Sequence, residues 1–588
     1  MKDILKQTIS TAISQLQAQF TLPDSLSLDI QIERSKDDSK GDFACNIALM
    51  LAKQAGMKPR ELAEKIVAQV DVTENIKKIE IAGPGFINFF LSEHAFLSVI
   101  HTVLAERTAY GTCQQFKNTP IHLEYVSSNP TGPLHVGHGR SAAYGASLAN
   151  LLEAVGYKVH REYYVNDAGR QMHILATSVW LRYLALSGVN ITFPVNGYQG
   201  EYVKVIAEQL MQEHQQAFVV SKEVVLADVP ADLNDDGEGD KEKHIDGLIN
   251  NAKTLLGVEN YSIIFQLALK TILTDIREDL AGFRVTFDEW FSEQQLIDNG
   301  MIEHTFDVLR EKGYLYEKEG ALWFKASEFG DEKDRVLQKS NGDRTYFAND
   351  IAYHLNKLER GNAHIIDVLG ADHHGYIARM RAAIEAFTGK KDVLTVPLIQ
   401  FVSLYRGKEK VAMSTRGGEF VTLRELRNEV GNDAARFFYV MRKADQAMDF
   451  DLELAKSRSN ENPVYYIQYA HARICSVFRQ LKEKKLTWIV GEGVEHLEQL
   501  TESPERALLK FLGRYPEVVF SAATQYEPHQ LVHYLRELAA DFHSYYNTSL
   551  FIVEDEPRRC ARLHLITVIK QVLANGLALL GVSAPESM

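Results

Sequence analysis

The sequence predicts an α/β core built on a parallel sheet, preceded by a small α+β domain and followed by an all-helical bundle. Two segments in the middle of the chain run in the order strand, loop, helix, strand, which is typical of βαβ units. The first hundred or so residues combine helical periodicity with two extended runs around Gly83-Pro84-Gly85. After about Leu454 the patterns are helical only.

Length and composition are those of a large globular protein. The 588 residues are 45% apolar and 24% charged, and the formal net charge is −14. At roughly 100 to 200 residues per domain, three or four domains are expected. An acidic balance is not typical of a generic nucleic-acid binder, so any RNA contact is expected from local basic patches.

Cysteine usage and apolar runs bear on compartment and metals. The four cysteines are scattered, without a C-x-x-C unit, so no zinc is expected and a reducing compartment is favoured. The N-terminus lacks the apolar core of a signal peptide. The longest apolar run, near 572–582, falls short of the roughly 20 residues that span a bilayer. We expect a cytoplasmic protein that makes no membrane contact.

Residues 1–110 form the predicted small domain. Apolar residues from Leu5 to Phe20 recur at helical spacing, and two further helices are expected. Two strands are expected on either side of the glycine–proline turn. The expected ranges after the first helix are 46–55 and 59–70 for helices, and 78–82 and 86–91 for strands.

Residues 118–453 form the predicted core. Its two βαβ units each contain a strand, a helix and a returning strand. The first is expected at 121–125, 137–155 and 158–165, and the second at 363–369, 375–387 and 394–402. An insertion is expected at about 192–258, with 232–243 as a polar, acidic, mobile loop. Residues 454–588 are expected to form helices at 463–485, 504–512, 529–546 and 556–580.

The most specific segment lies between the first core strand and its helix. It reads Ser127-Ser128-Asn129-Pro130-Thr131-Gly132-Pro133-Leu134-His135-Val136-Gly137-His138. Ligands bind at the carboxyl edge of such sheets, and helix N-termini favour phosphate groups. Imidazoles add hydrogen-bond donors, and Gly137 lets a nucleotide approach the backbone.

His135-Val136-Gly137-His138 resembles the H-x-G-H motif of class I aminoacyl-tRNA synthetases. The resemblance implies a Rossmann-like catalytic core and use of ATP with Mg²⁺. It also implies that His135 and His138 are catalytic and stabilise the α-phosphate as an amino-acid carboxylate attacks it. The ATP-binding residues expected by resemblance are Pro133, Leu134, His135, Val136, Gly137, His138, Gly370, Asp372, Met413 and Ser414.

The family's second motif, K-M-S-K-S, is only partly present. Met413 and Ser414 match, whereas Ala412 and Thr415 stand where the family has lysine. The missing charge is expected from one of the cations Arg406, Lys408, Lys410 or Arg416. Arginyl enzymes often depart from the motif in this way.

Within this class the chain resembles the arginyl-tRNA synthetases. Arginine presents five N–H donors in a planar fork, which calls for carboxylates and carbonyls. The resemblance implies that Asn129 meets the backbone end of arginine, while Glu124, Tyr346 and Asp350 hold the amino group and guanidinium. The full set of expected arginine-binding residues is Glu124, Ser127, Asn129, His138, Tyr346, Asp350 and His373. Asp350 as a helix cap and Glu124 as a structural ion pair remain open alternatives.

Basic and aromatic residues interleave after residue 454, as in the helical anticodon-binding domain of that family. The expected tRNA-binding residues are Tyr465, Tyr469, Arg473, Arg479 and Arg559. The N-terminal module resembles the family domain that contacts the tRNA elbow. The implied activity is ATP-dependent charging of tRNA with L-arginine, first as arginyl-adenylate and then on the terminal 2′-OH. It further implies a monomer whose first step waits for bound tRNA.

Three alternatives remain open at this point. Another class I synthetase would usually need zinc cysteines or an editing domain larger than the insertion. A small nucleotidyltransferase shares the histidine motif but needs no helical bundle with a basic, aromatic face. A catalytically silent tRNA-binding protein would explain the missing lysines, and arginine-dependent pyrophosphate exchange would exclude it.

Overall fold

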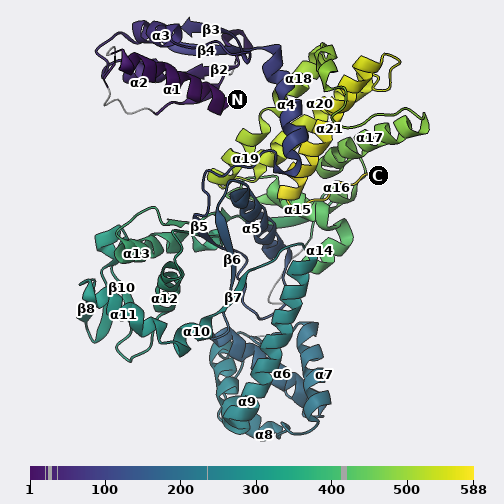
Figure 1. Ribbon diagram of the computed structural model, residues 1–588. Helices are drawn as coiled ribbons and strands as arrows, with labels where there is room; N and C mark the ends of the chain where they lie inside the picture. The colour runs from purple at the N-terminus through teal and green to yellow at the C-terminus, as the bar shows by residue number, and fades with distance from the viewer. Residues whose placement is uncertain (20–21, 24–28, 36, 235, 412–419) are drawn as a thin grey trace.

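The protein is described from a computed structural model that covers residues 1–19, 22–23, 29–35, 37–234, 236–411 and 420–588. Three bodies follow one another along the chain: a small N-terminal domain, a central sheet with its helices, and a C-terminal bundle (Figure 1). A further group of helices extends from the central body, on the side away from the bundle. No helix of the described residues is long and apolar enough to cross a bilayer.

The N-terminal domain packs three helices on a four-stranded antiparallel sheet of order β1–β2–β4–β3. Its apolar core is separate from that of the central body. The predicted helical stripe is correct as far as Leu16, and Phe20 lies outside the described residues. The elements are α1 (Lys2–Ala18), β1 (Ile32–Arg34), β2 (Phe43–Cys45), α2 (Ile47–Leu51), α3 (Pro59–Ala68), β3 (Ile76–Ala82) and β4 (Phe86–Leu91).

The central body is built on a five-stranded parallel sheet of order β13–β11–β5–β6–β7. The chain builds the sheet outward from β5 in both directions, and parallel sheets bind ligands at the carboxyl edge where the order reverses. The strands are β5 (Pro120–Glu124), β6 (Lys158–Val165), β7 (Glu289–Ser292), β11 (His364–Asp367) and β13 (Leu394–Thr395).

Helices cover this sheet. α5 (Val136–Ala154) packs on β5 and β6, and Gly145 allows this because a Cβ there would lie 2.3 Å from the Tyr125 ring. α12 (Tyr346–Glu359) also lies against the sheet, with Tyr353 and Lys357 buried. α13 (Ile377–Thr388) completes the second βαβ unit. The predicted strand at 394–402 is divided among β13, β14 (Leu398–Ile399) and β15 (Val402–Arg406).

The predicted insertion is mainly helical. It contributes α7 (Glu201–His214) and α8 (Lys222–Val225), which pack with α6 (Arg170–Leu186) and α9 (Lys241–Gly282). The acidic stretch expected as a loop over 232–243 ends earlier, because the Asp240 carboxylate caps α9. α9 breaks at Gly257, which adopts φ 70°, and then continues into the core.

Smaller elements surround the sheet. They are α10 (Glu293–Asp298), α11 (Met301–Glu311), β8 (Leu315–Lys318), β9 (Ala321–Phe324), β10 (Arg335–Gln338), β12 (Leu369–Gly370), β16 (Glu409–Lys410), α14 (Leu423–Val430), α15 (Asn432–Val440), β17 (Met448–Asp451) and α16 (Leu452–Lys456). β8, β9 and β10 form an antiparallel sheet beside α11.

The C-terminal bundle contains the four predicted helices and one more. They are α17 (Pro463–Glu483), α18 (Ser503–Leu512), α19 (Tyr515–Thr524), α20 (His529–Thr548) and α21 (Glu556–Leu579). Its apolar core is continuous with that of the central body. Arg436 of α15 is 1% exposed and donates to the carbonyls of Leu580 and Phe283, which ties the end of the bundle to the end of α9.

The N-terminal domain contacts the bundle. α4 (Glu93–Glu106) leads out of the domain and packs on α18 and α21 (Figure 1). Arg34 pairs with Glu517 at 3.0 Å, and Arg506 pairs with Glu93 at 2.6 Å. These contacts join segments from opposite ends of the sequence.

Candidate active site

The predicted histidine motif forms the N-terminus of α5. His135 is the N-cap, and its Nδ1 accepts the Gly137 N–H at 3.1 Å. His138 Nδ1 accepts the His135 N–H at 3.3 Å, and the two rings stack with centroids 3.7 Å apart. A Cβ on Gly137 would lie 2.9 Å from the His135 ring, so only glycine leaves the ring in this place.

Burial keeps both imidazoles neutral. It lowers the pKa of His135, and it lowers that of His138 well below 6.5, with the neighbouring His135 adding to the effect. Since each Nδ1 already accepts a backbone N–H, each neutral ring carries its proton on Nε2. The motif therefore offers two N–H donors at a helix N-terminus, an arrangement suited to phosphate oxygens.

The segment that begins at Phe420 holds this helix start in place. Leu423 N–H donates to the Leu134 carbonyl at 2.8 Å, and Val136 N–H donates to the Val421 carbonyl at 3.2 Å. Tyr439 Oη donates to the Val136 carbonyl at 2.8 Å. Met413 and Ser414 themselves lie outside the described residues, as does Arg416.

The loop between β5 and α5 is strained. Val126 and Ser127 adopt φ of 70° and 37°, which costs about 1–3 kcal/mol for each non-glycine residue. Ser127 Oγ accepts the Tyr164 N–H at 3.1 Å, and Asn129 donates to Gln171 at 2.8 Å. Asn129 is exposed, whereas Ser127 is half-buried.

Glu124 ends β5 at the carboxyl edge of the sheet. It is 7% exposed, and its Oε2 lies 2.6 Å from Nζ of the fully buried Lys357. The ion pair left open by the sequence is therefore present. The carboxylate is also close enough to Asp350 to act on it electrostatically.

Asp350 lies on α12 as predicted, but it is not the helix cap. The cap is Thr345, whose Oγ1 accepts the Ala348 N–H. The Asp350 carboxylate accepts a hydrogen bond from Tyr376, and burial raises its pKa, with the charge of Glu124 adding to the rise. Tyr346, expected on the same helix face, is 75% exposed.

Glu293 was not identified from the sequence. It is 6% exposed, and its Oε1 accepts a hydrogen bond from Asn349 at 3.0 Å. Its Oε2 and the Asn349 Oδ1 are buried without a partner in the described structure. Burial raises the pKa of Glu293, and the Asp350 charge adds to this. Buried acceptors without donors beside carboxylates suit a ligand rich in N–H groups.

Tyr164 connects these acids. Burial raises its pKa, and the charges of Glu293, Asp350 and Glu124 raise it further, so all three carboxylates act on the same phenol. The sequence predicted Glu124 and Asp350 but offered no signal for Glu293, which comes from a short helix outside every motif.

The second strand edge carries Gly370, Asp372 and His373. Gly370 is the N-cap of a 3₁₀ turn at Ala371–Tyr376. Asp372 and His373 are exposed, and Nε2 of His373 lies 3.6 Å from Oδ2 of Asp372. Among the cations considered as substitutes for the missing lysines, Arg406 pairs with Glu429, with Nη1 2.6 Å from Oε1. Lys408 and Lys410 are exposed and have no ion-pair partner within the described ranges.

Among the described residues, one group has the spacing of metal ligands: His122, His160 and Glu162, whose ligand atoms lie within 4.8 Å of one another. Arg360 already donates to Glu162, at 3.0 Å from Oε1. A guanidinium in that position would repel a metal cation, so these residues do not fit a metal site.

α17 carries most of the predicted tRNA-binding residues. Tyr465 and Tyr469 stack at 5.9 Å, and the Arg473 guanidinium lies 4.5 Å from the Tyr469 ring centre. Arg479 is exposed and donates to the Glu586 carbonyl. Arg559 differs: it is 8% exposed and donates to the carbonyls of Val553 and Glu554, so its guanidinium is already committed to a loop.

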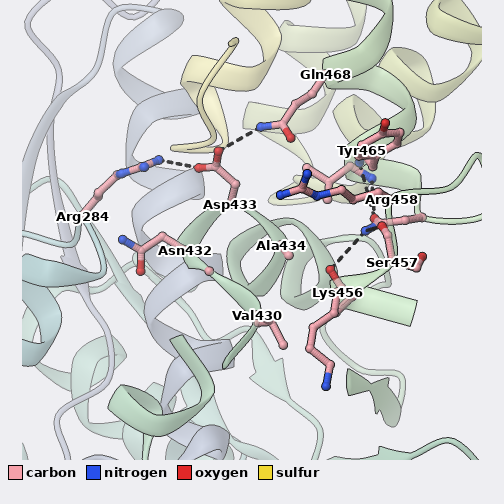
Figure 2. A pocket seen from close by; sticks show the side chains of 14 residues that line it. Arg284, Val430, Asn432, Asp433, Ala434, Lys456, Ser457, Arg458, Tyr465 and Gln468 are labelled. Atoms are coloured by element: carbon pink, nitrogen blue, oxygen red, sulfur yellow. Dashed lines mark hydrogen bonds and ion pairs between the residues drawn. The ribbon is translucent and has the colours of Figure 1, made fainter. Parts of the chain in front are cut away.

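A cavity of about 300 Å³ lies where α15 and α16 meet α17 (Figure 2). Asp433 lines this cavity, and its carboxylate accepts hydrogen bonds from Arg284 at 2.6 Å and from Gln468 at 2.9 Å. Arg458 and Tyr465 line the same cavity, which therefore adjoins the aromatic face of α17.

Comparison with known proteins shows to which family the chain is similar. Three family models match successive parts of the chain: the arginyl tRNA synthetase N terminal domain at residues 3–91, the class I (R) tRNA synthetase catalytic domain at 99–459, and the DALR anticodon binding domain at 467–588.

Full-length relatives carry the same domains. The arginine–tRNA ligases of Thioalkalivibrio sulfidiphilus and Legionella pneumophila subsp. pneumophila are 56% and 53% identical over 588 residues, covering all of both chains. The arginyl-tRNA synthetase of Thermus thermophilus has a TM-score of 0.74 at 22% identity, with both chains covered completely, and so shares the fold. The chain therefore belongs to the arginyl-tRNA synthetase family of class I aminoacyl-tRNA synthetases.

Proposed function

We propose that this arginine–tRNA ligase binds the ATP phosphates over the N-terminus of α5. The observation that carries the proposal is the pair of neutral, stacked imidazoles with Nε2–H groups available at a helix N-terminus. His135 and His138 stabilise charge on the α-phosphate as the arginine carboxylate attacks and pyrophosphate leaves. The remaining proposed ATP contacts are Pro133, Leu134, Val136, Gly137, Gly370, Asp372, Met413 and Ser414.

Arginine occupies the acidic pocket around Tyr164. Glu293, Asp350 and Glu124 supply negative charge for a guanidinium and an ammonium group, and the unpaired oxygens of Glu293 and Asn349 supply acceptors. The other proposed contacts are Ser127, Asn129, His138, Tyr346 and His373. Binding relieves the repulsion among the three acids, so a cationic side chain is selected over a neutral one.

The aromatic, basic face of α17 receives unpaired bases of tRNA. Tyr465 and Tyr469 are the stacking surfaces, and Arg473 and Arg479 face the phosphates. Arg559 is left out of this surface because its donors are used inside the fold. We divide the chain into domains at 1–110, 118–453 and 454–588, with the insertion at 192–258.

ATP is expected to bring Mg²⁺, since the phosphates themselves are the usual ligands of this ion. We propose a monomer without zinc that acts in the cytoplasm, where tRNA is charged. Lys408 and Lys410 are the described cations best placed in sequence to replace the missing lysines of the second motif.

ATP–pyrophosphate exchange with each of the twenty amino acids, with and without total tRNA, tests the proposal. Exchange is expected with arginine alone, and only when tRNA is present. Exchange with another amino acid would remove the acidic pocket from substrate recognition. Arginine-dependent exchange without tRNA would contradict the proposal that the first step requires bound tRNA.

A further inference from the structure

Four carboxylates form a row across the central sheet. Strand pairing places Asp367 of β11 beside Glu124 of β5, then Glu162 of β6, then Glu289 of β7. Asp367, Glu124 and Glu162 are 4%, 7% and 0% exposed. Adjacent buried acids of this kind are stable as anions only when cations lie beside them.

The last turns of α12 supply one cation for each pair. Lys357 Nζ lies 2.6 Å from Glu124 Oε2 and 2.8 Å from Asp367 Oδ1. Three residues later, Arg360 donates to Glu162 at 3.0 Å and to Glu289 at 2.8 Å. Lys357 is fully buried, and its third donor direction faces the Tyr353 ring, 4.2 Å from the centroid.

His354 connects this network to the proposed arginine pocket. Its Nε2 lies 2.7 Å from Asp367 Oδ2, and its Nδ1 lies 2.7 Å from the carbonyl oxygen of Asp350. The ring therefore bridges the Asp367 side chain and the backbone of the α12 turn that carries Asp350. Through Lys357 and Asp367, the end of β5 and the helix that carries Asp350 are therefore held together.

We propose that Lys357 is a positioning residue for arginine binding, which offsets the repulsion between Glu124 and Asp367 and fixes the Glu124 carboxylate relative to Asp350. This inference rests on the proposed arginine pocket. The other ionisable groups around Glu124 are Tyr353, Asp350 and His354 on α12, Asp367 on β11, Tyr164 and Glu162 on β6, and His122 on its own strand. Within the described residues Lys357 is the only cation that contacts the Glu124 carboxylate, so without it the two facing carboxylates repel each other and Glu124 loses the contact that fixes its position.

Arg360 provides a matched control, because it serves the other half of the same row from the same helix. K357M is expected to raise the KM for arginine about tenfold or more, the loss of one charge-assisted contact, while the KM for ATP stays within about twofold. R360M is expected to lower the melting temperature and leave the KM for arginine near the wild-type value. Parallel effects of K357M and R360M on both KM values would reduce Lys357 to a structural residue.

Two further variants make the outcome specific. K357Q keeps hydrogen-bonding capacity without the charge, and it is expected to raise the KM for arginine as K357M does, even if K357M does not fold. Adding D367N to K357Q removes the competing acid, so part of the affinity for arginine should return. A normal KM for arginine in K357Q, or no recovery in the folded double variant, overturns the proposal.

E124Q separates this inference from the assignment of the pocket. If E124Q leaves the KM for arginine unchanged, Glu124 does not contact arginine and the pocket assignment fails with the inference. If E124Q raises the KM for arginine but K357Q does not, the pocket stands and only the role of Lys357 is lost.

Discussion

The side chains of His135 and His138 at the start of α5 are held in a fixed orientation and are uncharged. The backbone N–H groups of Gly137 and His135 fix the two rings by bonding their Nδ1 atoms. A free imidazole rotates and titrates near neutral pH, whereas these rings are stacked and their pKa values are lowered by burial. Little reorganisation is then needed when charge develops on a phosphate.

Replacement of His138 by alanine is expected to lower kcat by roughly 10², as loss of one charge-stabilising donor does. Steady-state aminoacylation measures this. The control is H374A, because His374 is exposed and has no proposed contact with ATP or arginine. A kcat near that of the wild type in H138A would remove His138 from catalysis.

Replacement of Asp350 by asparagine is expected to raise the KM for arginine far more than that for ATP, and to stabilise the unliganded fold at neutral pH. Burial raises the pKa of Asp350, so the folded chain holds this proton more tightly than the unfolded chain. The free energy of unfolding therefore falls as pH rises from the unfolded value near 3.9 through the raised folded pKa.

Melting temperatures of wild type and D350N, measured without ligands from pH 4 to 8, test the stability part. The advantage of D350N should grow with pH. Equal melting temperatures at pH 8, or equal changes in the two KM values, would contradict the assignment of a strained, arginine-binding acid.

At the scale of secondary-structure elements, α12 and α17 each have two roles. α12 presents Asp350 to the proposed pocket at one end and the cations Lys357 and Arg360 to the sheet at the other. α17 buries one side in the bundle, including Ile467 and Ile474, and leaves the stacked tyrosines half-exposed. The apolar stripe positions the residues proposed to bind tRNA, because the two sides share one helix.

Replacement of Tyr465 by alanine is expected to weaken tRNA binding by about 1–3 kcal/mol, the cost of one lost base stack, without changing the KM for arginine or ATP. Filter binding at fixed salt concentration measures this. R559A is the contrasting variant: it should lower the melting temperature, since two loop carbonyls lose their donor, and should leave tRNA affinity unchanged. The reverse pattern would exchange the roles of the two residues.

The sequence predicted the elements whose signal is local. Alternation at 121–125 and the strand–loop–helix order were sufficient for β5 and α5, and regular apolar spacing was sufficient for α17. α19 was missed because Pro516 resembles a break, although proline is favoured in a first helical turn. The helices of the insertion were obscured by the acidic stretch before Lys241.

The candidate site was predicted less completely than the fold. The histidine motif and Asp350 come from contiguous patterns, but Glu293 enters from a six-residue helix that only the tertiary structure brings to Tyr164. Arg559 illustrates the opposite case, a residue expected at the tRNA-binding surface that is buried instead. Its guanidinium donates to a carbonyl inside the fold and is therefore not available to tRNA. Partner choice of this kind depends on packing between distant segments, which spacing alone does not encode.

At the scale of the whole molecule, buried donors join the central body to the bundle. Arg436 of α15 is 1% exposed and donates to the Leu580 carbonyl of the bundle. From α5, the Tyr144 hydroxyl donates to the Tyr526 carbonyl at 2.7 Å and Asn150 donates to the Leu579 carbonyl at 3.0 Å. The shared apolar core and these donors indicate that the two bodies unfold together.

Replacement of Arg436 by methionine is expected to separate their thermal unfolding, at a cost of about 3 kcal/mol or more, because several buried carbonyls lose their donor. Scanning calorimetry should then resolve two transitions where the wild type gives one for these bodies. R424M, at a half-exposed pair with Asp275, is the control and should change the profile little. A single transition at the wild-type temperature in R436M would show that the apolar core alone couples the two bodies.

The contacts between the N-terminal domain and the bundle have a consequence for synthesis on the ribosome. Glu93 and Arg506 are 413 residues apart, so at about 5–20 residues per second the newly made domain waits about 20–80 s for its docking surface. Its separate apolar core allows it to fold during that interval. β5 has no such independence, because its neighbour β11 emerges long after β6. The unpaired edge of β5 is therefore the part of the nascent chain most in need of a chaperone.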